Sequence, residues 1–140
     1  MQIRIDVLQV ILEYTDLFLY DLKNIDADLH REYTGVDNSL ILSNADYLLK
    51  QGARVIFRIP VIPGINTMDD ELQRLFSFVE ERKAMLEEVH LLPYHRIAES
   101  KYARLKMKKQ MGDVEEPDAS FMDGLRARFE TTGLKVSIGG

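Results

Sequence analysis

Four side chains that can bind charged groups lie within or just after predicted apolar strands: Asp21, Lys23, Arg58 and His95. Arg58 follows Asp21 by 37 residues, and His95 follows Arg58 by another 37, about the length of one strand–helix unit. Residues that recur once per unit lie at equivalent ends of successive parallel strands, where α/β folds bind their ligands. An acid, two cations and an imidazole at one edge suit a ligand with carboxylate and amine groups. The Asp21 carboxylate could also bind a metal cation.

Each of these residues also has an ordinary structural interpretation. Asp21 and Lys23 are two positions apart, so they share one side of a strand and could form a solvated pair. Arg58 is harder to explain in this way, because an arginine within an apolar strand is costly unless it is paired or faces a site. His95 follows a Pro-Tyr turn and could equally cap a helix or be exposed.

The remaining chemistry-bearing residues give weaker signals. His90 lies within a predicted strand and is interpreted as a core or packing residue, whereas His30 lies in a polar turn and is interpreted as a surface residue. The sequence contains no Ser-His-Asp order, no glycine-rich phosphate loop and no two-histidine metal spacing. It therefore assigns no catalytic residue.

The composition is that of an ordinary globular protein of 140 residues with a net charge of −5 at pH 7. That charge argues against non-specific nucleic-acid binding, which needs clustered positive charge. No apolar run approaches the roughly 18 residues of a membrane span, and the amino end has no signal-peptide core, so we expect a cytoplasmic protein with no membrane partner. The absence of cysteine excludes disulfides, thiolate metal sites and cysteine nucleophiles from this chain.

Alternating strands and helices predict the α/β class, with a parallel sheet of about four strands and flanking helices. The predicted strands are residues 17–21, 54–61, 89–92 and 134–138, and residues 1–140 are expected to form a single domain. Residues 16–23 are apolar with little alternation, which suits a strand buried on both faces. Pro60 lacks an N–H and indicates an irregular or partly unpaired strand end.

Helices are expected at residues 3–14, 40–51, 67–83 and 118–131. Three- and four-residue spacings predict the buried side of the first helix. That predicted stripe consists of Ile3, Val7, Val10, Ile11 and Tyr14.

Four segments, in this order, carry a specific resemblance: residues 14–23 (YTDLFLYDLK), 30–35 (HREYTG), 58–64 (RIPVIPG) and 91–95 (LLPYH). In sequence and spacing they resemble the carboxyl-terminal half of the glycyl-radical-enzyme activating enzymes, the family of pyruvate formate-lyase activating enzyme. The similarity extends from about residue 14 to residue 140. The family belongs to the radical S-adenosylmethionine (SAM) enzymes, whose core is a partial (β/α)6, TIM-like barrel. The resemblance therefore implies that the predicted sheet is the second half of such a barrel.

The resemblance also implies an activity. Members of the family use a 4Fe-4S iron–sulfur cluster to cleave SAM into a 5′-deoxyadenosyl radical, which removes a hydrogen atom from a glycine of a partner glycyl-radical enzyme. Asp21 and Lys23 match an Asp-x-Lys motif that holds the methionine end of SAM, and Asp21 can also contribute to a monovalent-cation site. Arg58 matches an arginine at the SAM and substrate rim, and His95 matches a histidine that approaches the nucleoside of SAM.

The chain departs from the family pattern in one large respect. The three cluster cysteines and the Gly-Gly-Glu segment of the family belong to earlier units and are missing here. Without thiolates this chain cannot hold the cluster in the usual way. We therefore expect the carboxyl-terminal portion of an activating enzyme, inactive alone, whose partners are the missing amino-terminal half of the barrel and a glycyl-radical enzyme. The unpaired sheet edge is a route to self-association.

Two other interpretations remain open. The chain could be a small, self-sufficient α/β enzyme that uses Asp21 and His95 as an acid–base pair, with Lys23 or Arg58 binding an anion. It could instead be a non-enzymatic half-barrel that binds a partner through its open edge.

Overall fold

The structure, a computed structural model, describes residues 3–94 and 116–139. Its sheet has four parallel strands in chain order, namely β1 (Phe18–Asp21), β2 (Val55–Val61), β3 (Glu88–Pro93) and β4 (Lys135–Ile138). The helices are α1 (Ile5–Glu13), α2 (Ala27–Thr34), α3 (Ser39–Lys50), α4 (Asp69–Arg82), the short 3-10 helix η1 (Lys83–Met85) and α6 (Ala119–Glu130). This architecture confirms the predicted α/β class and the four-stranded parallel sheet with flanking helices. No helix in the two described ranges is long and apolar enough to cross a membrane.

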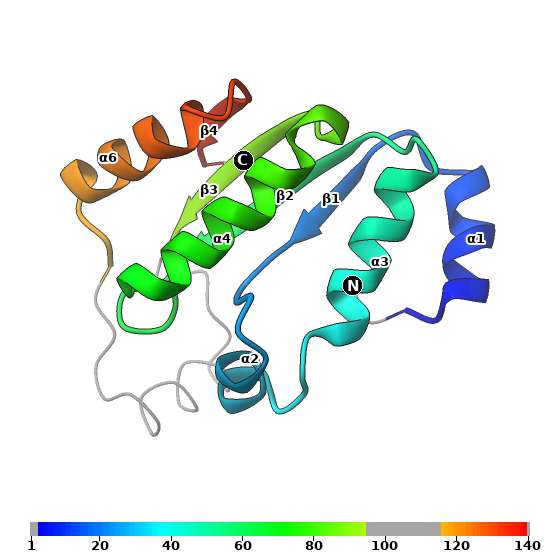
Figure 1. The fold of residues 1–140 in the computed structure, drawn as a ribbon, viewed down its shortest axis with the longest axis horizontal. Coiled ribbons are helices and arrows are strands. Elements are labelled where there is room, and N and C mark those ends of the chain that lie inside the picture. Colours follow the sequence, from blue (N-terminus) through cyan, green and yellow to red (C-terminus); the bar gives the residue numbers. More distant parts are fainter. Residues whose placement is uncertain (1–2, 95–115, 140) are drawn as a thin grey trace.

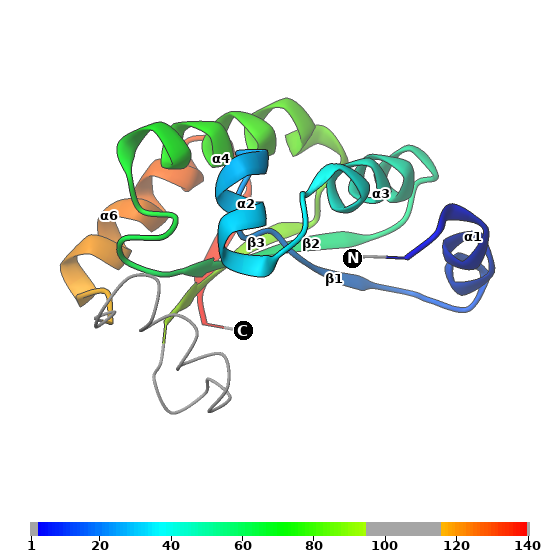
Figure 2. The same cartoon turned by 90° about the horizontal axis from the view of Figure 1, so that it is seen from below.

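The helices gather on one face of the sheet. α3, α4 and α6 cover that face, and α1 lies beside α3 near the β1 edge (Figures 1 and 2). The core between these layers is built around Tyr20 and Phe57, whose rings lie 6.2 Å apart, and Phe57 also contacts Phe78 of α4. Truncating Phe57 would therefore remove contacts to both the sheet and the helix layer.

The opposite face of the sheet carries no helix from the described part of the chain (Figure 2). Side chains alternate between the two faces of a strand, so every second residue points to this side. We call it the open face; it consists of Leu19, Asp21, Ile56, Arg58, Pro60, Glu88, His90, Leu92, Lys135 and Ser137. The carboxyl ends of the strands border it, together with the loops that lead into α2 and α4.

The prediction that the first strand is buried on both faces is wrong for the described residues. Phe18 and Tyr20 are buried, but Leu19 between them is 49% exposed. β1 is the edge strand of the sheet, and Leu19 lies on its open face. No helix from the described part of the chain covers that face. Continuous apolar composition indicates a buried strand only where both faces have a neighbour.

The predicted buried stripe of the first helix is wrong for three of its five residues, while Ile3 and Ile11 are partly buried against the core. α1 buries Leu8, whereas Val7, Val10 and Tyr14 are 45%, 59% and 83% exposed. Apolar residues occupy more than half of the helix circumference, opposite Asp6, Gln9 and Glu13, so more than one apolar stripe satisfies helical spacing and periodicity cannot choose among them. The buried side of α1 is set by its packing against α3.

Tyr20 supplies a testable feature of the core. Its ring is 1% exposed, its hydroxyl donates a hydrogen bond to the Ile41 carbonyl of α3, and burial raises the pKa of Tyr20 well above its ordinary value of 10.0. We expect Tyr20→Phe to lower the free energy of unfolding at pH 7 by about 1 kcal/mol, because one buried hydrogen bond is lost.

The sign of the pH effect follows from the raised pKa. Below about pH 10 the phenol is neutral in both states, whereas above it the unfolded chain ionises first, so the wild type loses stability as pH rises. Urea unfolding should show that the free energies of unfolding of wild type and Tyr20→Phe differ less above pH 10 than at pH 7. A constant difference across that range would contradict the raised pKa.

Candidate functional site

Two of the predicted site residues meet on the open face. Asp21 ends β1 and is the register partner of Arg58 in β2, so their side chains project from neighbouring strands to the same side. Asp21 Oδ1 lies 3.6 Å from Arg58 Nε, and the side chains are 54% and 35% exposed. The ion pair is therefore open to solvent on one side and available to a ligand.

Arg58 keeps an unused donor at this position. Its Nε atom is buried, and among the described residues it has no hydrogen-bond partner, since the 3.6 Å approach of Asp21 exceeds hydrogen-bond length. A buried N–H without a partner costs free energy and calls for an explanation. A ligand would meet the exposed part of the Arg58 side chain rather than this covered atom.

Lys23 lies just beyond the end of β1, on the side predicted for it. Leu22 and Asn24 are buried, and Lys23 between them is exposed, so the alternation of the strand continues past Asp21. The Leu22 N–H also donates to the Arg58 carbonyl at 2.9 Å, which extends the pairing of β1 with β2 by one residue. Asp21 and Lys23 therefore point to one side of the sheet.

The histidines differ from expectation. His95 lies outside the described residues, so its predicted place at this edge stays a prediction. His90 lies on the open face as the register partner of Arg58 rather than among the core residues, but its side chain is only 13% exposed, which agrees with the packing interpretation; its Nε2 lies 3.2 Å from Glu88 Oε2. The apolar flanks of His90 suggested burial, but strand alternation places it on the uncovered side.

His30 corrects a second expectation. It is 3% exposed rather than a surface residue, and its Nδ1 lies 2.8 Å from the Val36 carbonyl and 3.0 Å from the Thr34 hydroxyl. These contacts tie α2 to the turn that follows it. His30 therefore has a structural role.

A group of buried polar side chains, which sequence reasoning missed, holds the loops beside the site. Glu71 is 0% exposed and accepts hydrogen bonds from the Ile25 and Asp26 backbone N–H groups. Asn38 donates to the Asn24 and Ile25 carbonyls at 3.0 and 2.7 Å. These bonds fix the backbone that directly follows Lys23.

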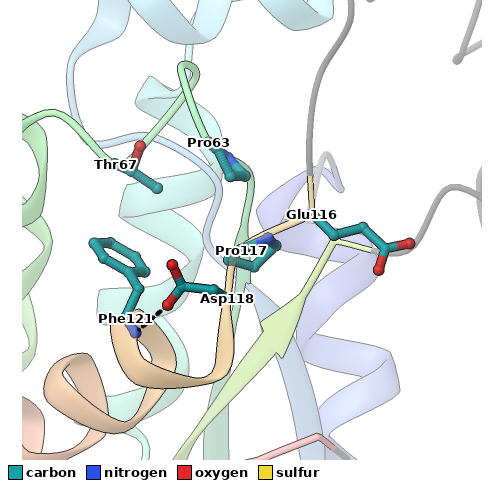
Figure 3. A pocket seen from close by; sticks show the side chains of 6 residues that line it. All are labelled: Pro63, Thr67, Glu116, Pro117, Asp118 and Phe121. Carbon is teal, nitrogen blue, oxygen red and sulfur yellow. Dashed lines mark hydrogen bonds between the residues drawn. The ribbon is translucent and has the colours of Figure 1, made fainter.

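A pocket of about 240 Å³ lies at the same end of the sheet, between the loop after β2 and the start of α6 (Figure 3). Its polar groups already serve their own loops: Asp118 accepts from the Phe121 N–H at 2.7 Å, and the Thr67 hydroxyl accepts from the Gly64 N–H. Of the predicted site residues that the structure describes, namely Asp21, Lys23 and Arg58, none lines it. The open face, rather than this pocket, is the candidate site.

The described residues offer no ready-made metal centre. They contain no group of three or more His, Cys, Asp or Glu side chains placed to hold an ion. The expected contribution of Asp21 to a cation site therefore needs a ligand or other residues to complete it.

Comparisons with known proteins point to one family. The chain is 38% identical over 126 residues to the trans-4-hydroxy-L-proline dehydratase activating enzyme of Clostridioides difficile, a match that covers 89% of this chain and 41% of that protein. Its fold is similar to the crystal structure of a domain of pyruvate-formate lyase-activating enzyme from Bacteroides vulgatus, with a TM-score of 0.79, 25% identity and coverage of 98% and 75%. A radical SAM methyltransferase from Sphaerobacter thermophilus, 16% identical, shares the fold over 86% of this chain and 32% of that one at a TM-score of 0.57.

The extent of these matches limits what they show. The chain spans 41% of the trans-4-hydroxy-L-proline dehydratase activating enzyme and 52% of the pyruvate formate-lyase 1-activating enzyme of Escherichia coli. No family model matches the sequence. The four-stranded sheet and its helices therefore correspond to part of a radical SAM partial barrel, as the resemblance implied.

Proposed function

Because this chain is homologous to the glycyl-radical-enzyme activating enzymes over most of its length, we propose that it forms the carboxyl-terminal part of such an enzyme. The open face then binds SAM, and the intact enzyme generates a radical on a glycine of a partner glycyl-radical enzyme. The single domain formed by residues 1–140 contributes the SAM-binding strand ends. The cysteine-free chain is inactive alone.

The residues present fit SAM. The methionine end of SAM carries a carboxylate and an ammonium group. The open face offers the Asp21 carboxylate and the partly exposed Arg58 guanidinium, and the Lys23 ammonium lies just beyond the end of β1. Asp21 suits the ammonium group of the ligand, and Lys23 and Arg58 suit its carboxylate, because charge-assisted hydrogen bonds are the strong ones. Bound SAM supplies the source of the radical. His95 is proposed to approach the nucleoside.

The residues present do not fit an iron–sulfur cluster. Such clusters are held mainly by cysteine thiolates, and this sequence has no cysteine. The cluster must therefore come from another part of the enzyme, and these 140 residues supply no step at the iron.

The observation that carries the proposal is the direct register pairing of Asp21 with Arg58, which sets a carboxylate and a guanidinium side by side on the open face. An arginine within an apolar strand is costly unless it is paired or faces a site. The Asp21 carboxylate and the exposed part of the Arg58 side chain offer a ligand one group of each charge. The homology supplies the identity of that ligand.

The first experiment is the intact mass and iron content of the natural gene product, purified anaerobically from its source cells. We expect a product heavier than the 16.2 kDa of this chain that carries iron. Added SAM, a reductant and a glycyl-radical enzyme should then give the glycyl-radical signal in electron paramagnetic resonance. An iron-free product of this chain's own mass would overturn the proposal.

Arg58→Ala tests the role of the rim. We expect SAM affinity to fall at least about ten-fold, because a charge-assisted contact is lost. The free energy of unfolding should change by less than about 1 kcal/mol, because the Asp21–Arg58 pair is partly exposed. Equilibrium binding and urea unfolding measure the two effects. Unchanged SAM affinity would show that Arg58 does not contact SAM.

One observation favours a partner-binding module as the second candidate. Within the described ranges β1 pairs with β2 alone, and large apolar side chains are exposed near this edge. They are Ile5, Val7, Val10, Tyr14, Leu17 and Leu19. Open edges with apolar neighbours promote association. Gel filtration distinguishes the cases, since a partner module gives a defined complex whose formation is insensitive to Arg58→Ala.

A further inference from the structure

The pairing of β1 with β2 stops at a chemical boundary. The Phe18 N–H donates to the Arg54 carbonyl and the Leu22 N–H to the Arg58 carbonyl, both at 2.9 Å. The next bond of this parallel pattern would come from the N–H of residue 60. Residue 60 is a proline and has no N–H, so this bond to Leu22 is missing. The segment with Lys23 must be held in another way.

Asn66 replaces the ladder at this point. Its side-chain Nδ2 donates to the Lys23 carbonyl at 3.0 Å and also to the Pro60 carbonyl, while its Oδ1 accepts from the Ile62 N–H at 2.9 Å. The residue is 2% exposed. One buried amide therefore joins the end of β1 to the end of β2, which carries Arg58.

The loop after Lys23 is fixed from the same region. Asn24 donates to the Ile65 carbonyl at 3.3 Å, next to Asn66. Asn38 and Glu71 then hold the backbone of residues 24–26. Hydrogen bonds thus hold the backbone before and after Lys23, although its own side chain is exposed.

We propose that Asn66 is a positioning residue: by fastening the Lys23 carbonyl to the end of β2, it sets the Lys23 ammonium group and Arg58 at the separation that the SAM carboxylate requires. The inference rests on the proposed function. A long lysine side chain loses less entropy on binding when its backbone is already fixed. Removing the amide therefore weakens SAM binding through Lys23, without any contact between Asn66 and SAM.

The test compares Asn66→Ala with Asn44→Ala in the complete gene product. Asn44 is a matched control because it is 1% exposed and its amide donates to the Ile3 carbonyl at 2.6 Å, away from the strand ends. We expect Asn66→Ala to weaken SAM binding about ten-fold in equilibrium dialysis, whereas Asn44→Ala leaves it within about two-fold. Thermal scans should show a comparable loss of melting temperature for both variants. Equal SAM affinity of the two variants overturns the inference.

A double-mutant cycle with Lys23→Ala separates positioning from general damage. The Lys23→Ala variant keeps the backbone carbonyl that Asn66 binds, so Asn66→Ala should weaken its SAM affinity by no more than about two-fold. Additive effects would show that Asn66 does not act through Lys23. If Asn66→Ala does not fold, Asn66→Ser replaces it in the cycle, because the serine hydroxyl still donates one bond. Asn66→Ser should lower SAM affinity by less than ten-fold, and this loss should also be absent in the Lys23→Ala background.

The two possible failures are distinguishable. If the wild-type protein does not bind SAM, the proposed function fails, and the inference fails with it. If the wild type binds SAM and Lys23→Ala weakens it, but the effect of Asn66→Ala is additive, only the inference fails. Hydrogen exchange in residues 22–26 adds a readout without SAM: it should quicken in Asn66→Ala and not in Asn44→Ala, and unchanged exchange contradicts the inference.

Discussion

Replacing Glu71 with alanine is expected to lower the free energy of unfolding by about 3 kcal/mol, the largest single-residue stability effect that we predict for the polar side chains. Two backbone N–H groups, those of Ile25 and Asp26, lose their acceptor, and a fully buried side chain leaves a cavity. Arg74, whose Nη1 lies 3.4 Å from Glu71 Oε2, loses a partner as well. Urea unfolding, with the m-value checked for constancy, measures the change.

Asp70→Ala is the matched control for this prediction. Asp70 lies in the same first turn of α4 but is exposed, so its removal should change stability by no more than about 0.5 kcal/mol. Glu71→Gln, which preserves the shape and one acceptor oxygen, should fall between the two. If Glu71→Ala is as stable as Asp70→Ala, the carboxylate does not hold the loop after β1.

The position of the site follows from the sequence because it depends on strand order alone. Asp21 and Arg58 were expected at neighbouring strand ends, and the register pairs them directly. Parallel strands joined by helices leave little choice, since their carboxyl ends meet at one edge. The missing N–H of Pro60, read from the sequence as an irregular strand end, marks the point where the ladder stops.

The groups that support the site could not be found in this way. Glu71 and Asn66 bind backbone atoms of residues 23–26, more than 40 positions earlier in the chain. Backbone carbonyls and N–H groups are the same in every residue, so the sequence gives no sign of such pairings. The buried sides of α1 and β1 were missed for a related reason, because only the neighbouring layer decides which apolar side chains are covered.

Asp21→Asn is expected to weaken SAM binding about 100-fold, equivalent to about 2.7 kcal/mol, the largest functional effect that we predict. The substitution preserves size but removes the charge that the proposal assigns to the ammonium group of SAM. It also leaves Arg58 without the carboxylate 3.6 Å from its Nε. Stability should change by less than about 1 kcal/mol, because the Asp21 side chain is 54% exposed and its ion pair is screened by solvent.

Asp28→Asn provides the control, since Asp28 is 94% exposed and pairs at 3.7 Å with Arg31 on α2 rather than with a site residue. It should leave SAM affinity unchanged. Equilibrium dialysis of the two variants in the complete gene product, at two salt concentrations, decides between a specific contact and general electrostatic attraction. A specific contact gives a loss confined to Asp21→Asn at both salt concentrations. Equal SAM affinities of Asp21→Asn and Asp28→Asn would mean that the Asp21–Arg58 pair is an ordinary solvated ion pair. The open face would then not bind the methionine end of SAM.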